Sequence, residues 1–246
     1  MDQASIEDRA PVTVVLVHGA FADSSSWTGV IERLQAVGVR VIAPPNPLRG
    51  AAHDAAYIAS FLDQISGPVL VVGHSYGGVV ITNAASMAKN VVGLIYVAAF
   101  APDEGETLLE IESDSRDSVL VSALLQYQYP TEPGAETVVE FVVDPDKFHE
   151  AFAADLPMRQ TAVMAATQRP ASLLAFSEPT GTPAWKSLPS WAVVATGDKA
   201  AGSDVVRQMA KRAGATTTEV EGSHAIMLSQ PQVVTDMILT ALNSVS

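Results

Sequence analysis

The stretch VVGHSYGGVV, at residues 71–80, constrains the fold more than any other part of the chain. An apolar, β-branched run precedes it and a helix-like apolar run follows, so the chain must turn sharply between residues 73 and 77. Glycine at both ends of this turn removes Cβ atoms that would collide, and Gly78 lets the new helix approach the sheet. The pattern predicts a strand–turn–helix unit that lifts the Ser75 hydroxyl above the carboxyl end of a sheet.

Six short apolar runs alternate along the chain with segments of helical pattern. The runs are apolar throughout, which is typical of strands buried on both faces of a parallel sheet. Strand and helix in repeated alternation predict the α/β class, with a mostly parallel six-stranded sheet flanked by helices. The predicted strands are residues 12–17, 39–43, 69–72, 91–98, 191–196 and 216–220. The predicted helices are residues 24–34, 51–65, 203–213 and 231 onward.

The segment from residue 103 to residue 185 breaks this alternation. It contains no core-like strand, only helix-like pieces separated by prolines, and it is too long for a plain loop. We predict a helical cap at 103–185, inserted before the last two strands of a core made of residues 1–102 and 186–246. Large apolar side chains in the cap would fill its own core or line a pocket: Leu124, Leu125, Phe148, Met158, Met164 and Phe176.

Composition excludes several classes of function. The formal net charge of -13 disfavours nucleic acid and anionic membrane surfaces as partners. The absence of cysteine excludes disulfides, thiolate metal ligands and a cysteine nucleophile. Neither a His-Glu-x-x-His zinc motif nor a phosphate-binding glycine loop occurs, so we expect no metal and no cofactor.

The N-terminal segment and the apolar runs predict neither a signal peptide nor a membrane span. The opening MDQASIEDRAP lacks the basic-then-apolar order of a signal peptide. No apolar run approaches the roughly 18 residues that a membrane-spanning helix needs. We therefore expect a soluble cytoplasmic protein, monomer or homodimer, that acts on a small molecule.

A serine hydroxyl is a weak nucleophile unless a base removes its proton, so Ser75 requires a histidine. His224 is the strongest of the five histidines, because its segment EGSHA follows the last predicted strand and precedes the final helix. It therefore lies at the same edge of the sheet as Ser75, where catalytic groups of open α/β sheets gather.

A third group must orient the imidazole and balance its charge. Asp198 follows the strand 191–196 directly and gives the chain order Ser, Asp, His that this kind of fold uses. Asp103, after the preceding strand, and Asp204, nearby in the chain, are the two rivals. We favour Asp198.

Developing negative charge on the substrate needs backbone N–H donors. Tyr76, the residue after the nucleophile, supplies one, and the loop after the first strand supplies the other through Ala20, with Phe21 as the fallback. His18 is expected to hold that loop by hydrogen bonds rather than to do chemistry. His74 is interpreted as a residue of the turn, not as a base.

The motifs VLVHGAFADSSSW, VVGHSYGG, ATGDK and EGSHAIML resemble those of the α/β-hydrolase superfamily, and the resemblance extends over nearly the whole chain. Within it they look like the plant methyl-ester esterase and hydroxynitrile lyase branch and its bacterial esterase relatives. The resemblance implies a six-stranded parallel core with an inserted helical cap. It also implies Ser75 as nucleophile, His224 as base, Asp198 as acid, and Ala20 and Tyr76 as oxyanion donors.

One departure separates the two chemistries of that branch. Related hydroxynitrile lyases carry a lysine beside the catalytic histidine, where this chain has Ala225. We therefore expect a serine esterase that cleaves neutral carboxylic esters, including lactones or thioesters, through an acyl-enzyme. The alternatives are a non-hydrolytic enzyme on the same scaffold, such as a perhydrolase-like haloperoxidase or a lyase, and a non-catalytic small-molecule receptor.

Overall fold

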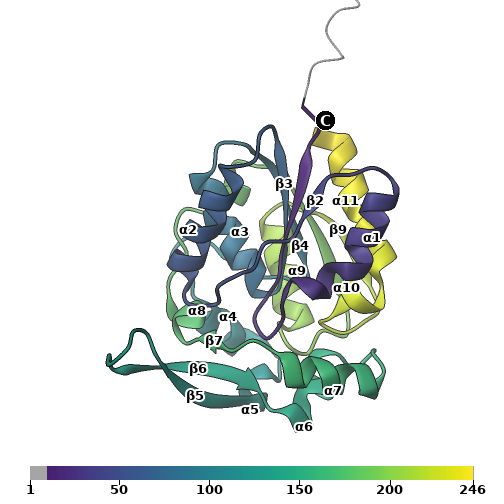
Figure 1. The fold of residues 1–246 in the computed structure, drawn as a ribbon. Helices are drawn as coiled ribbons and strands as arrows, with labels where there is room; N and C mark the ends of the chain where they lie inside the picture. The colour runs from purple at the N-terminus through teal and green to yellow at the C-terminus, as the bar shows by residue number, and fades with distance from the viewer. Residues whose placement is uncertain (1–9, 246) are drawn as a thin grey trace, which may run out of the picture.

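The computed structural model describes residues 10–245 of the chain, so most of the segment predicted to lack a signal peptide lies outside the described residues. Six parallel strands form the central sheet in the order β2-β1-β3-β4-β8-β9 (Figure 1). The predicted parallel six-stranded sheet is confirmed. Its strands are β1 (Thr13–Val17), β2 (Val41–Ile42), β3 (Val69–His74), β4 (Val91–Val97), β8 (Ser190–Ala195) and β9 (Thr216–Val220).

Helices cover both faces of this sheet. The helices of one face are α2 (Ala51–Leu62), α3 (Tyr76–Met87) and α9 (Ser203–Arg212). Those of the other face are the 3-10 turn η1 (Ser24–Trp27), α1 (Thr28–Ala36), α10 (Ile226–Ser229) and α11 (Pro231–Val245). The four longest predicted helices are therefore present, with ends within a few residues of those expected.

The core consists of two apolar layers separated by the sheet. Along β1, Val15 and Val17 join the layer under α2 and α3, whereas Val14 and Leu16 join the layer under α1 and α11. All four side chains are fully buried, and burial of a side chain of this size stabilises the fold by about 1.5–3 kcal/mol. Strand β9 differs from the prediction, because its Thr216–Val220 sequence is largely exposed at the edge of the sheet.

The segment between β4 and β8 is inserted into the core, and its part from α5 to α7 (residues 120–167) forms a separate layer beneath the sheet (Figure 1). Its helices are α4 (Leu108–Asp114), α5 (Leu120–Ala123), α6 (Pro145–Phe152), α7 (Met158–Thr167), α8 (Leu174–Ser177) and the 3-10 turn η2 (Ala184–Lys186). It also contains an antiparallel sheet of β5 (Leu124–Pro130), β6 (Thr137–Val143) and β7 (Ala171–Ser172). We call this segment the cap.

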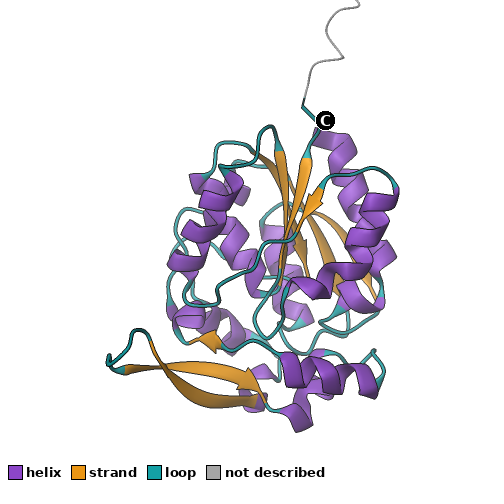
Figure 2. Cartoon of the chain, viewed as in Figure 1, coloured by secondary structure: helices purple, strands orange, loops and turns teal. Residues whose placement is uncertain are grey.

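The expectation that the cap is purely helical is wrong, since β5 and β6 form a long hairpin there (Figure 2). Strand β5 alternates Tyr127 and Tyr129 with glutamines and is mostly exposed, so it lacks the continuous apolar run of a core strand. The hairpin is stabilised by the hydrogen bonds between its two strands and by the packing of one of its faces on the rest of the cap. A search for fully buried strands does not detect such a hairpin.

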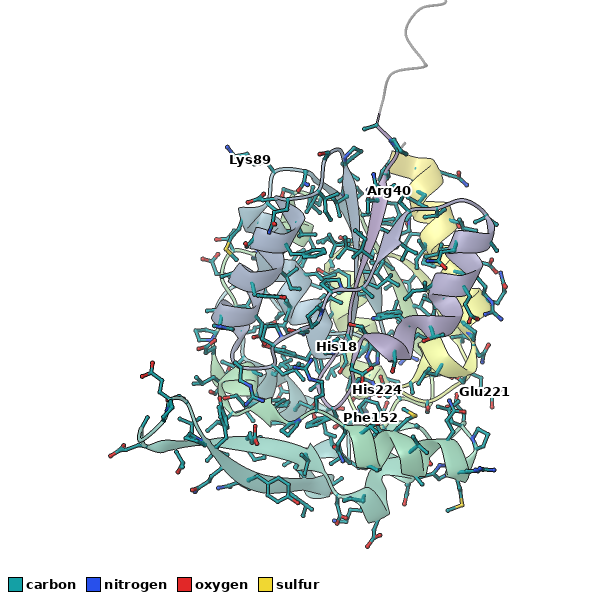
Figure 3. The ribbon with its side chains drawn as sticks, in the orientation of Figure 1. His18, Arg40, Lys89, Phe152, Glu221 and His224 are labelled. Carbon is teal, nitrogen blue, oxygen red and sulfur yellow. The ribbon has the colours of Figure 1, made fainter. Side chains whose placement is uncertain are left out.

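The cap covers the carboxyl ends of the core strands. His18 and His224, which follow β1 and β9, lie near the cap together with its Phe152, whereas Arg40 and Lys89 lie at the opposite end of the sheet (Figure 3). Segments that leave the strands toward the cap are therefore the ones brought together. These are the segments in which the sequence places its candidate residues.

Candidate active site

Ser75 lies in a strained turn between β3 and α3. Its backbone has φ 53° and ψ -126°, a conformation that costs a non-glycine residue on the order of 1–3 kcal/mol unless the surroundings enforce it. The predicted turn is present, and its glycines are required by close backbone approaches. A Cβ on Gly77 would lie 2.5 Å from the Val17 carbonyl oxygen, and one on Gly78 would collide with the Phe100 carbonyl oxygen.

His224 and Asp198 form a buried pair next to this turn. The His224 Nδ1 atom lies 2.8 Å from Asp198 Oδ2, and both side chains are 1 % exposed. Asp198 Oδ1 accepts hydrogen bonds from the Ala200 and Ala201 N–H groups, each at 2.9 Å. Nδ1–H therefore donates to the carboxylate, which leaves the lone pair on Nε2. Within residues 10–245, His224 Nε2 has no hydrogen-bond partner.

The two rival carboxylates are engaged elsewhere. Asp103 lies 2.5 Å from Lys186 Nζ, and the hydrogen bond from that lysine lowers the pKa of Asp103. Asp204 accepts hydrogen bonds from the Ser115 hydroxyl and the Arg116 N–H group. Of the three candidates, Asp198 is the one that contacts His224.

The loop after β1 lies against Ser75. A Cβ added to Gly19 would come 2.6 Å from Ser75 Cβ, so only glycine lets the two segments meet. Ala20 and Phe21 follow it, and Phe21 has a left-handed φ of 59°. The backbone N–H groups of Ala20, Phe21 and Tyr76 donate no hydrogen bond to any other residue in the described range 10–245. They are therefore available to a ligand oxygen beside Ser75.

The other two histidines near the site serve as supports. His18 Nδ1 lies 2.9 Å from the Gly19 carbonyl oxygen, and its Nε2 accepts from the Asn46 N–H group at 2.9 Å. Burial lowers the pKa of His18 to about 4, so the ring is neutral and holds the loop, as predicted. His74 Nε2 lies 3.0 Å from the His224 carbonyl oxygen, and burial holds the pKa of His74 well below its ordinary value.

Comparison with known proteins agrees with this arrangement. Residues 14–237 match the sequence model described as the alpha/beta hydrolase family. The chain belongs to this family. The match covers both the core and the cap, from β1 to the last helix.

Relatives of this alpha/beta hydrolase include bacterial, fungal and structurally characterised proteins. The chain is 32% identical over 110 residues to a carbendazim hydrolyzing esterase of Nocardioides sp. (strain SG-4G), a match of 39% of the chain and 46% of that esterase. It is 26% identical over 253 residues to the alpha/beta hydrolase nvfD of Aspergillus novofumigatus (strain IBT 16806), which covers 93% and 95% of the two chains.

Among solved structures, polyneuridine aldehyde esterase superposes with a TM-score of 0.79 at 18% identity. The superposition covers 94% of this chain and 99% of that one. At this identity the likeness shows the fold. The resemblance to the alpha/beta hydrolases that the sequence suggested is thus confirmed.

Several residues at the site of this alpha/beta hydrolase were not found from the sequence. The Tyr76 hydroxyl donates to Asp54 Oδ2 at 2.8 Å, and Asp54 is fully buried. Asp155, in the cap, accepts from the Ser223 N–H group at 3.0 Å and also from the Ser223 hydroxyl. The partners come from separate elements, so no spacing along the chain could have revealed them.

Two cavities flank an aromatic contact above the site. Phe21 and Phe176 stack with ring centroids 6.2 Å apart, and Phe176 also stacks on Tyr76. On the Phe21 side, a cavity of about 300 Å³ is lined by Phe21, Ala22, Asp23, Ser25, Ser26, Thr28, Gln160, Met164, Thr167, Gln168 and Leu228. A cavity of about 220 Å³ is lined by Leu109, Glu112, Leu120, Val121, Leu124, Gln126, Phe141 and Phe176.

The apolar cap residues named from the sequence therefore divide into different roles. Leu124, Met164 and Phe176 line the two cavities. Phe148 is buried against Phe152, whose ring lies 4.8 Å from His224 between centroids. Leu125 and Met158 are exposed and line neither cavity: their exposed fractions are 37 % and 72 %.

Residues 10–245 contain no group of three or more His, Asp or Glu side chains placed to hold a metal ion. In the same range, the helices are all too short or too polar to cross a membrane.

Proposed function

We propose that this alpha/beta hydrolase is a serine esterase with Ser75 as nucleophile, His224 as base and Asp198 as acid. The observation that carries the proposal is the buried 2.8 Å contact between His224 Nδ1 and Asp198 Oδ2. It leaves Nε2 without a partner among residues 10–245, and the His224 ring packs on His74, the neighbour of the strained Ser75. A fixed tautomer with a free Nε2 lone pair is what a base for a serine hydroxyl requires. Membership of the family and the match to an esterase support a hydrolase.

The reaction then follows from the positions of these groups. His224 Nε2 takes the Ser75 proton while Oγ attacks the ester carbonyl, and the Ala20 and Tyr76 N–H groups stabilise the oxyanion. The imidazolium donates its proton to the leaving alcohol, and an acyl-enzyme remains. His224 next takes a proton from water, which attacks the acyl carbon, and the imidazolium returns that proton to Ser75 Oγ as the acid is released. Asp198 stabilises the imidazolium throughout.

The surroundings favour a neutral ester with an apolar group on at least one side of the carbonyl. The cavity beside Phe176, whose ring stacks on Tyr76, is lined mainly by apolar side chains and can take an apolar group of the ester. The formal net charge of -13 disfavours the approach of anionic substrates. A small-molecule ester with neutral, largely apolar substituents fits both features.

The decisive experiment compares Ser75→Ala, His224→Ala and the double variant in the hydrolysis of a p-nitrophenyl ester. Because the two groups act as one unit, each single variant and the double variant should lose a similar factor of roughly 10³ or more in kcat. An organophosphonate should form a mass adduct at Ser75 of the wild type and none in Ser75→Ala. Additive losses, or an adduct at another residue, would show that Ser75 and His224 do not work together.

A further inference from the structure

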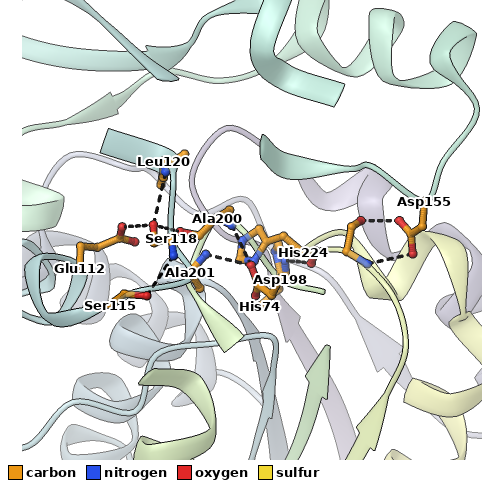
Figure 4. A network of polar contacts seen from close by, with 11 residues as sticks. His74, Glu112, Ser115, Ser118, Leu120, Asp155, Asp198, Ala200, Ala201 and His224 are labelled. Carbon is orange, nitrogen blue, oxygen red and sulfur yellow. Dashed lines mark hydrogen bonds and ion pairs between the residues drawn. The ribbon is translucent and has the colours of Figure 1, made fainter. Parts of the chain in front are cut away.

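A buried carboxyl group of the cap, Glu112 on α4, is connected to the loop that carries Asp198 (Figure 4). Glu112 Oε2 lies 2.8 Å from the Ser118 hydroxyl oxygen. The same hydroxyl oxygen lies 2.8 Å from the Ala200 carbonyl oxygen and accepts from the Leu120 N–H group at 3.3 Å. Ser118 therefore joins the cap to the residues that hold the Asp198 carboxylate.

Counting protons at Ser118 determines the state of Glu112. A hydroxyl has one proton to donate and two lone pairs that accept. The Ala200 carbonyl oxygen can only accept, so it takes the Ser118 proton. The Glu112 oxygen, at equal distance, must then be the donor, which requires a protonated carboxyl group. With this assignment Ser118 donates once and accepts from both Glu112 and Leu120, and every group is satisfied.

The surroundings of Glu112 favour the same state. Its side chain lines the apolar cavity beside Leu120, Leu124 and Phe176, and the residue is 7 % exposed. Burial raises the pKa of Glu112 to about 8, and the negative charge of Asp198 adds to the increase. A hydrogen bond from Ser118 to the carboxylate would lower this pKa, but that bond competes with the one to Ala200.

No cation near α4 offsets these effects in the described residues. Helix α8 carries no ionisable side chain. On α9, Asp204 accepts from Ser115 and pairs with Arg116, and Lys211 is exposed. The two arginines of α9 pair with Glu106 and Glu219. Lys199, in the loop after β8, pairs with Glu150. On α4 itself, Glu110 bonds to Thr107, and Asp114 is exposed.

The Ser118 contact matters for the proposed reaction because of what Ala200 does. The Ala200 N–H group donates to Asp198 Oδ1 while its carbonyl group is held by Ser118, and the Val119 N–H group holds the neighbouring Lys199 carbonyl. The cap thus fixes the loop that orients the Asp198 carboxylate toward His224. If Glu112 ionises, it can no longer donate, and the Ser118 proton turns toward the carboxylate and leaves Ala200.

We propose that Glu112 is a positioning residue that works as a neutral acid: by donating to Ser118 it holds the Asp198 loop, and its ionisation uncouples the cap from that loop. This inference rests on the proposed ester hydrolysis. It adds an alkaline limit to the pH range over which the proposed triad works.

The activity test compares the pH dependence of kcat for a neutral p-nitrophenyl ester, from about pH 6 to about pH 10, after subtraction of spontaneous hydrolysis. In the wild type, kcat should fall about fivefold across the ionisation of Glu112 as the acid loop loses its alignment, with little change in KM. Glu112→Gln keeps an N–H donor for Ser118 and cannot ionise, so this decrease should disappear. Glu110→Gln, on the exposed side of the same helix, should keep the wild-type profile.

A stability test reports the protonation state of Glu112 without measuring enzyme activity. The pKa of Glu112 is raised from 4.5 to about 8 in the folded chain, so the folded state holds a proton that the unfolded state has lost. The contribution of Glu112 is fully present below its unfolded pKa and decreases as pH rises toward the folded pKa. Glu112→Gln should therefore gain unfolding free energy relative to the wild type between about pH 5 and about pH 8, and Glu110→Gln should not.

Each outcome decides the inference. The inference is overturned if the alkaline decrease in kcat persists in Glu112→Gln. It is also overturned if the unfolding free energies of the wild type and Glu112→Gln change equally with pH. If ester turnover is unaffected by Ser75→Ala, the proposed function fails, and the stability test still decides the state of Glu112. If Glu112→Gln does not fold, carbon-13 labelling of the glutamates in the wild type should show one carboxyl signal that titrates near pH 8; its absence would overturn the inference.

Discussion

The core and the cap of this alpha/beta hydrolase contribute to the site in different ways. The core places Ser75, Asp198 and His224 at the ends of β3, β8 and β9, so their positions follow from backbone geometry. The cap contributes side chains that hold the loops beneath it, such as Glu112 through Ser118. The comparison indicates that the core supplies the proposed reacting groups, whereas the cap lines the cavities and holds the loops that carry two of those groups.

The largest effect is expected from the core, at Asp198. In Asp198→Asn the amide donates to His224 and favours the wrong tautomer, so kcat should fall by about 10⁴. Asp103→Asn is the matched control, because Asp103 also follows a core strand but pairs with Lys186. Steady-state kinetics of both variants check this. Near-normal turnover of Asp198→Asn with loss in Asp103→Asn would reverse the assignment of the acid.

The core could be predicted from the sequence because its signals are local. The glycines around Ser75 report a turn whose backbone contacts leave no room for a Cβ, and this requirement is visible in the sequence alone. The continuous apolar runs of β1 and β3 likewise reflect burial on both faces. Chain order was then enough to bring Asp198 and His224 to one edge.

The cap could not be predicted in the same way, because its contacts join distant positions. The bond of Asp155 to Ser223 spans 68 residues, and that of Ser118 to Ala200 spans 82. Strand β5 carries polar and aromatic residues in place of an apolar run, whereas β6 (TVVEFVV) is a largely apolar, β-branched run that the prediction of a helical cap overlooked. Glu112 is buried beside side chains from α5, β5, β6 and α8, and nothing in its local sequence indicates this burial.

A moderate effect is expected where the cap holds the His224 loop. Asp155 accepts two hydrogen bonds from Ser223, next to His224. Asp155→Asn should lower kcat about tenfold by loosening that loop, with little change in folding. Because Asp155 acts through Ser223, the double variant with Ser223→Ala should lose little more than Asp155→Asn alone. Kinetics of the three variants test this, and independent, additive losses would contradict it.

The same contact predicts a response to acid. Partial burial opposes ionisation of Asp155, but the hydrogen bonds from Ser223 prevail and lower the pKa of its carboxyl group. Stabilisation by this contact is present at neutral pH and is lost as pH falls below 3.8 through the lowered pKa. Asp155→Asn should therefore flatten the acid side of the stability curve, measured by denaturant unfolding.

The smallest effect is expected where the hairpin of the cap meets the core at Arg49. Its guanidinium lies 2.8 Å from Glu140 Oε2 and 4.3 Å from the Tyr129 ring centroid. Arg49 is partly exposed, so Arg49→Ala should cost on the order of 1 kcal/mol or less of unfolding free energy and leave ester turnover nearly unchanged. Its effect should instead be local: amide hydrogen exchange should speed up across β5 and β6 while β1 and β3 stay protected. Arg40→Ala, at the opposite end of the sheet, is the control and should leave the hairpin unchanged.

Because β5 is an exposed edge strand, its exchange should already exceed that of β3 in the wild type. Equal protection of the two strands, in both wild type and Arg49→Ala, would mean that the cap and the core open as one unit, and the division of roles between them would then need revision.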